Sequence, residues 1–201
     1  MNLESVIERA DIWRGKDLSP RVQGVSSGFE DLDALLPERG WPRGALTEIL
    51  TEREGVGAIR LLMPAMARLS DDKRWLALIA PPYIPYAPAF AALGVDLSRI
   101  LVVHDRNGRD KLWAFEQALR SGTCNAVFAW LPYTDPGYLR RLQLAAEAGE
   151  AMGVVFRSQR ALNDVSPAAL RLKLTATNSG VSVKVLKCRG GWPAGECVLR
   201  P

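Results

Sequence analysis

The chain has 201 residues, a formal net charge of +4 and a hydrophobic fraction of 48%, which are typical of a folded globular protein and exclude a disordered one. No apolar run approaches the roughly 20 residues that cross a bilayer, and the first residues lack a signal-peptide core, so we expect a soluble, cytoplasmic protein without membrane contact. Three cysteines without a C-x-x-C pair and a single histidine argue against a disulfide framework and against a zinc site.

The start of the chain predicts two short helices. Apolar residues at helical spacing indicate an amphipathic helix over residues 3–13, and a polar, proline-containing linker follows it. We therefore separate residues 1–23, an N-terminal helix and linker, from a domain over residues 24–201. A second helix is predicted from Phe29 to Leu36, where Pro37 ends it.

Apolar strands then alternate with helices. The predicted strands cover residues 45–50, 75–80, 100–103, 126–131 and 154–157. The predicted helices between them cover residues 57–69, 86–93, 110–120 and 138–152. Continuous apolar strands separated by helices indicate an α/β fold with a mostly parallel, twisted sheet and helices on both of its faces.

Residues 157–201 have a different character. Residues 170–175 and 181–187 alternate strictly between apolar and polar, with a turn at 177–180, which predicts an antiparallel β-hairpin with one basic, solvated face. This part of the chain has 8 Lys and Arg against 2 Asp and Glu, whereas residues 1–156 have 18 against 20. A basic end indicates an acidic partner, either nucleic acid or an anionic protein surface.

The turn after the first strand of the sheet resembles a P-loop without its phosphate-binding groups. Residues 44–60 have the strand, glycine-bearing turn and helix of a nucleotide-binding frame. A working P-loop ends in G-K-[ST], where the lysine reaches the phosphates and the hydroxyl binds Mg²⁺. Here Ala58 and Ile59 follow Gly57, so the lysine and the hydroxyl are both missing.

Longer segments resemble the RecA-type ATPase core in order and spacing, over about residues 24–157. They are Ser27 to Asp33, Gly44 to Ile49 and Leu93 to Leu101. The resemblance implies a RecA-like fold, a glutamate after the second strand and a magnesium-binding aspartate after the Walker B strand. The chain has Pro81 and Pro82 at the first position and Trp130 at the second. We therefore predict no enzyme activity and no catalytic, metal or cofactor site.

Among degenerate RecA cores, the chain resembles ImuA over nearly its whole length. The segments that carry this resemblance are Gly40 to Glu48, Pro167 to Leu174 and Lys187 to Pro193. It implies a non-catalytic adaptor of SOS-induced translesion DNA synthesis and mutagenesis. The implied partners are an ImuB-like Y-family polymerase homolog, an error-prone C-family polymerase and, further, single-stranded DNA or RecA.

Two alternatives stay open. One is SulA, the SOS cell-division inhibitor that blocks FtsZ assembly and shares ancestry with ImuA. The other is an active nucleotide-binding enzyme with an unusual loop.

The candidate contact residues lie in the basic C-terminal part. Arg157 and Arg160 belong to the loop after the 154–157 strand. The hairpin region contributes Arg171, Lys173, Lys184, Lys187 and Arg189. On one solvated strip these cations would bind phosphates, with an affinity that falls as salt rises. The alternative is an edge strand kept soluble by its lysines.

Trp192, in the tail between a glycine and a proline, is a candidate anchor for a partner. Packing of this side chain on its own sheet is the alternative.

Overall fold

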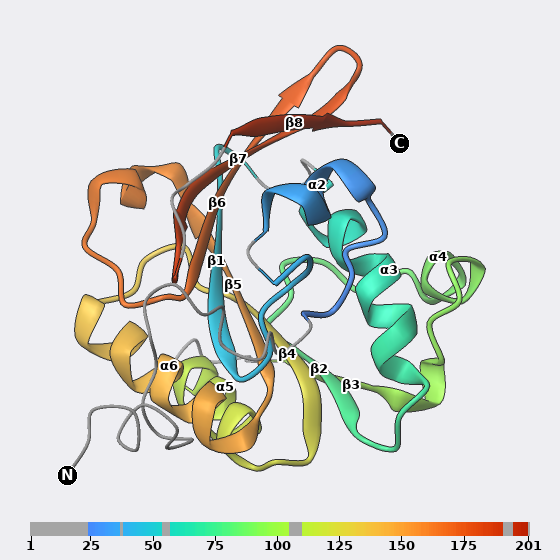
Figure 1. The fold of residues 1–201 in the computed structure, drawn as a ribbon. Helices are drawn as coiled ribbons and strands as arrows, with labels where there is room; N and C mark the ends of the chain where they lie inside the picture. Colours follow the sequence, from blue (N-terminus) through green and yellow to red (C-terminus); the bar gives the residue numbers. More distant parts are fainter. Residues whose placement is uncertain (1–23, 37, 54–56, 105–109, 191–194, 201) are drawn as a thin grey trace, which may run out of the picture.

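The computed structural model describes residues 24–36, 38–53, 57–104, 110–190 and 195–200. These residues form one eight-stranded sheet with helices on both faces (Figure 1). The predicted helix over residues 3–13 and the linker after it lie outside the described residues.

The elements follow the predicted alternation closely. The strands are β1 (Ala45–Thr51), β2 (Trp75–Ile79), β3 (Ile100–Val103), β4 (Cys124–Trp130), β5 (Met152–Ser158), β6 (Leu170–Thr177), β7 (Gly180–Cys188) and β8 (Glu196–Leu199). The α-helices are α2 (Glu30–Leu35), α3 (Ala58–Ser70), α4 (Ala87–Ala92), α5 (Lys111–Arg120) and α6 (Pro136–Gly149), and two 3₁₀ helices span Leu97–Arg99 and Gln159–Asn163.

The strand order is β3-β2-β4-β5-β1-β6-β7-β8, so β1 lies inside the sheet between β5 and β6. All pairs from β3 to β6 are parallel, and β7 and β8 add to the sheet in antiparallel fashion. The predicted α/β fold with a mostly parallel sheet is therefore confirmed. The strand β8, which pairs in antiparallel fashion with β7, was not predicted.

Two apolar cores cover the two faces of the sheet. On one face, Leu62 and Met66 of α3 pack with Leu32 of α2 against the strands. On the other, Phe115 of α5 and Leu142 of α6 belong to a second core. In Figure 1, α2, α3 and α4 lie on the right of the sheet, and α5 and α6 lie at the lower left.

The helices α5 and α6 approach each other very closely where α6 ends. A Cβ atom on Gly149 would lie 1.9 Å from the carbonyl oxygen of Leu119, which is impossible without movement of the backbone. Glycine at this position therefore permits the contact between the two helices, and β5 starts three residues later at Met152, immediately beside β1.

Among the described residues, no helix is both long enough and apolar enough to span a bilayer.

Candidate functional site

The chain enters α3 without the lysine and hydroxyl that follow the last glycine of a P-loop. Gly57 has φ +79°, a left-handed conformation that suits glycine, and precedes the first residue of α3. Ala58 and Ile59, the two residues after Gly57, are partly buried against the core under α3. Their side chains contribute apolar contacts where a nucleotide-binding protein presents a cation and a hydroxyl.

The ends of β2 and β4 are also apolar. After β2 the chain turns at Ala80, a non-glycine residue with φ +49°, and continues into Pro81 and Pro82. The last residue of β4, Trp130, stacks on Phe156 of β5 with ring centroids 4.6 Å apart and planes 26° from parallel. Neither strand end offers a carboxylate at these positions to bind Mg²⁺.

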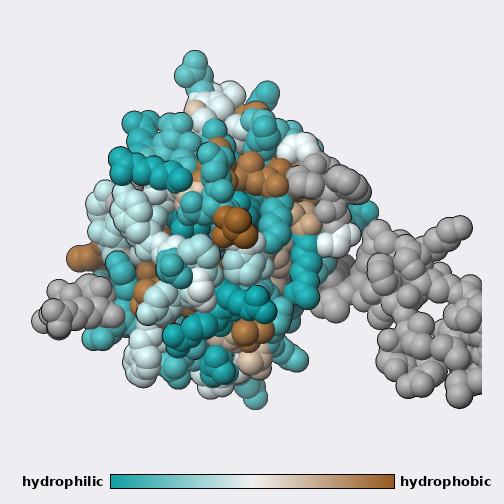
Figure 2. All heavy atoms as spheres, turned by 90° about the vertical axis from the view of Figure 1, so that its left-hand side faces the viewer, coloured by the Kyte–Doolittle hydropathy of each residue, from teal (hydrophilic) through white to brown (hydrophobic). Residues whose placement is uncertain are grey.

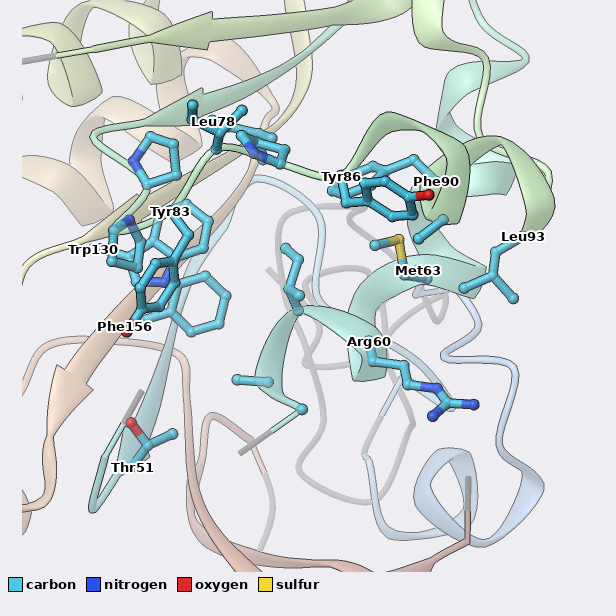
Figure 3. A pocket seen from close by; sticks show the side chains of 18 of the residues that line it. Thr51, Arg60, Met63, Leu78, Tyr83, Tyr86, Phe90, Leu93, Trp130 and Phe156 are labelled. Carbon is cyan, nitrogen blue, oxygen red and sulfur yellow. The ribbon is translucent and has the colours of Figure 1, made fainter. Parts of the chain in front are cut away.

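These strand ends form one wall of an apolar groove of about 590 Å³. Its other walls are the 81–86 loop, α4 and the start of α3. In Figure 3, Tyr83 lies beside Trp130 and Phe156 on one side of the opening, while Tyr86 and Phe90 lie near Met63 on the other. We call this space the aromatic groove.

The loop at the rim of the aromatic groove exposes large apolar side chains to solvent. Tyr83 is 68% exposed, Ile84 85% and Tyr86 71%. A contiguous exposed set of large apolar side chains is typical of a protein–protein contact, and tyrosine is enriched in such contacts. The groove is therefore suited to binding a protein rather than a polyphosphate.

A buried ionic cluster lies on the α6 face of the sheet. Glu48 of β1 is completely buried, and its Oε2 lies 3.3 Å from Nη1 of Arg157 and 3.1 Å from Nε of Arg171. The hydroxyl of Ser166 donates to the other oxygen of Glu48. Arg157 also contacts a carboxylate oxygen of Asp164 at 3.2 Å. The cluster fastens the segment between β5 and β6 onto the sheet.

This cluster corrects the predicted basic, solvated face of the hairpin at Arg171. Arg157 and Arg171 are both buried, and Arg171 donates to the carbonyl oxygens of Ala161 and Asp164 at 2.8 and 3.2 Å. Glu48 needs cationic partners because an unpaired buried carboxylate is very costly. Both arginines therefore face inward and are not available to a nucleic acid.

Two further predicted cations are engaged inside the chain. Lys187 donates from Nζ to the carbonyl oxygen of Ser166 at 2.7 Å, and burial, with Arg171 nearby, lowers the pKa of this ammonium group. Arg189 forms an ion pair with Glu147 of α6 at 2.9 Å. Both side chains connect the end of β7 to neighbouring segments.

The other predicted residues do not gather in one strip. Lys173 and Lys184 lie opposite each other on β6 and β7, while Arg160 donates to the hydroxyl of Tyr133 at 3.2 Å. Trp192 lies outside the described residues. The side that carries α6 and the 159–168 segment is largely hydrophilic with separate apolar spots (Figure 2). A contact between these exposed cations and a partner stays a prediction.

The aromatic groove was not predicted from the sequence. Its residues come from β1, α3, the 81–86 loop, α4, β4 and β5, which are far apart in the chain. The only local signal was the run Pro81-Pro82-Tyr83-Ile84-Pro85-Tyr86, in which large apolar residues alternate with prolines outside any predicted element. In the described part of the chain, no group of three or more His, Cys, Asp or Glu residues is arranged to hold a metal ion.

Comparison with known proteins identifies the family. The family model of the cell division inhibitor SulA matches residues 44–153, which is more than half of the chain. The cell division inhibitor SulA of Serratia proteamaculans (strain 568) is 27% identical over 135 residues, covering 67% of this chain and 80% of that protein. SulA of Edwardsiella piscicida is 31% identical over 99 residues, covering 49% of this chain and 59% of the relative.

The crystal structure of SulA from Pseudomonas aeruginosa is also similar. It has a TM-score of 0.47 and 29% sequence identity, and the match covers 56% of this chain and 97% of that one.

These matches overturn the resemblance to ImuA. The prediction of a translesion-synthesis adaptor is wrong, and so are its partners, an ImuB-like polymerase homolog and an error-prone C-family polymerase, because the matching family model and the relatives named above are SulA. The segments that favoured ImuA include Pro167 to Leu174 and Lys187 to Pro193, which lie outside the matched stretch. The chain belongs to the family of the cell division inhibitor SulA.

Proposed function

We propose that this chain inhibits cell division by binding FtsZ, and that the aromatic groove is the surface that binds it. The observation that carries the proposal is the exposed apolar loop of Tyr83, Ile84 and Tyr86, which lies within the stretch that the SulA family model matches. Large exposed apolar side chains contribute most of the binding energy in protein contacts when a partner excludes water from them.

The chain would inhibit division by binding FtsZ subunits and not by catalysing a reaction. An FtsZ subunit bound to the groove would be removed from assembly, so inhibition should be stoichiometric. We also propose the role after DNA damage that the resemblance to SulA implies, and we expect the chain to accumulate when the SOS response is induced.

We propose further that the sheet is a RecA-type ATPase core that has lost its catalytic groups. The order of β1, glycine turn and α3 supports this origin. So do the apolar residues at the three catalytic positions, namely Ala58, Pro81 and Trp130. The loss of these groups and the gain of the aromatic groove occur at the same edge of the sheet, the carboxyl ends of the parallel strands.

Sedimentation of FtsZ polymers tests the proposed function. With GTP present, the wild-type chain at equimolar concentration should lower the pelleted fraction of FtsZ by at least about half. Ile84→Asp should abolish this effect, because it introduces a charge at the centre of the contact without disturbing the core. Leu144→Asp is a matched control, since Leu144 is 53% exposed on α6.

Either of two results would refute the proposal: no loss of pelleted FtsZ with the wild-type chain, or equal inhibition by wild type and Ile84→Asp. Loss of inhibition in Leu144→Asp alone would assign the contact to α6 and refute the groove.

A further inference from the structure

A second apolar groove adjoins the aromatic groove. It has a volume of about 540 Å³ and lies between the start of α3, the chain just before α2 and the tip of the β6–β7 hairpin with β8. Its lining includes Phe29, Leu61, Pro64, Ala176, Val181 and Leu199. We call it the hairpin groove. Ala176, Val181 and Leu199 lie beyond residue 153, where the match to the family model ends.

The two grooves share part of one wall. Gly57, Arg60, Met63 and Leu93 line both of them. Arg60 and Met63 are one turn apart on α3, so this helix separates the two grooves, with Arg60 exposed and Met63 buried. Leu93 is 48% exposed and continues the apolar surface from one groove to the other. One partner segment can thus reach both grooves at once.

The charged residues in the described lining of the two grooves all carry positive charge. They are Arg53, Arg60 and Arg200, and all three are exposed. No carboxylate belongs to the described lining of either groove. A partner with carboxylates would be attracted to this rim, and a partner with lysines or arginines would be repelled.

We propose that the two grooves form one docking surface for an acidic, apolar segment of the partner. This segment seats apolar side chains in both grooves and sets a carboxylate between them against Arg60. The inference rests on the proposed function, because it takes the segment to belong to FtsZ. Beyond the proposed function, it predicts that β6, β7 and β8 take part in the contact with FtsZ and that the bound FtsZ segment carries negative charge.

Binding of purified FtsZ to the full chain, measured by calorimetry at two salt concentrations, tests the inference. Arg60→Glu should weaken binding about tenfold or more at low salt, because it sets a carboxylate against a carboxylate. Ala176→Asp should weaken binding by about the same factor through the hairpin groove alone. Wild-type binding should weaken as salt rises, and that of Arg60→Glu should not.

Two exposed positions provide matched controls. Arg140→Glu makes the same charge reversal on α6, and Ser179→Asp adds a carboxylate in the hairpin turn outside the groove lining. Both should bind within about twofold of wild type at surface sites away from the contact. Thermal unfolding of all variants should be unchanged, because Arg60 and Ala176 are exposed.

The outcomes separate the two proposals. Full-strength binding by both Arg60→Glu and Ala176→Asp would overturn this inference and leave the proposed function intact. No binding by the wild-type chain would overturn both. Self-association that Arg60→Glu abolishes, with FtsZ binding unchanged, would assign the grooves to a second copy of the chain and overturn the inference.

Discussion

At the residue scale, Glu48 is the most consequential charge in the chain. Its side chain is completely buried, and two arginines from β5 and β6 neutralise it at 3.3 and 3.1 Å. Such a cluster adds little net stability over an apolar core, but removing one partner leaves uncompensated buried charge. It also fixes the 159–168 segment, because Arg157 and Arg171 bond to Asp164 and Ala161 in that segment.

Glu48→Gln should therefore destabilise the fold by about 3 kcal/mol. The amide retains the shape of the side chain but leaves Arg157 and Arg171 without a counter-charge. Urea unfolding followed by tryptophan fluorescence measures the loss. Glu52→Gln, at an exposed position just after β1, is the matched control and should change stability by less than about 0.5 kcal/mol. Equal stability of Glu48→Gln and wild type would show that the cluster is not a net constraint on the fold.

The sequence could not reveal this cluster. The alternation Leu170-Arg171-Leu172-Lys173-Leu174 predicts one apolar and one solvated face for β6, and nothing nearby distinguishes Arg171 from Lys173. The difference comes from Glu48, which lies opposite Arg171 in the β1–β6 register although it is 123 residues away in the chain. Only the topology of the sheet brings the two charges together.

At the element scale, the surroundings of Gly57, where the chain enters α3, do not suit phosphate. The groove beside it is lined by Trp130, Phe156 and Tyr83. A polyphosphate there would lose its hydration against apolar side chains. The side chains from β4, β5 and the 81–86 loop therefore disfavour a nucleotide here, in addition to the residues after Gly57.

Restoring the missing residues of the turn should not restore nucleotide binding. The double variant Ala58→Lys, Ile59→Thr recreates G-K-[ST] after Gly57, yet calorimetric titration with Mg·ATP should show no saturable heat. The reason is that the ends of β2 and β4 still lack carboxylates to bind Mg²⁺. Binding of Mg·ATP by this variant with micromolar affinity would mean that the turn alone carries the difference.

Most elements could be predicted from local patterns, and the exceptions have physical causes. The strands β1, β2, β4 and β5 are buried along most of their length, so each is a mainly apolar run that is easily recognised in the sequence. The strand β8 has only four residues, Glu196–Leu199, and forms because β7 offers it a free edge. The helix α6 begins at Pro136, earlier than predicted, because Asp135 caps it through the amide of Gly137 at 2.7 Å.

At the scale of the whole molecule, the functional surface arises where the parallel strands end. Crevices outside the carboxyl ends of strands are the usual binding sites of α/β sheets, and this chain has aromatic side chains there from the 81–86 loop, α4, β4 and β5. The resemblance to ImuA depended partly on C-terminal segments, whereas the SulA match covers residues 44–153, where β1 to β4 and most of the groove are built. The C-terminal motifs therefore led to the wrong family.

Hydrogen exchange of the chain with and without FtsZ tests the central claim, that the aromatic groove at the carboxyl ends of the parallel strands is a protein-binding surface. We predict that the amides in residues 81–93, the loop and helix at the rim of the aromatic groove, exchange more slowly when FtsZ is bound. The amides in α6, on the other face of the sheet, should not change. Protection confined to α6 and the 159–173 segment, with residues 81–93 exchanging at the rate of the free chain, would contradict it.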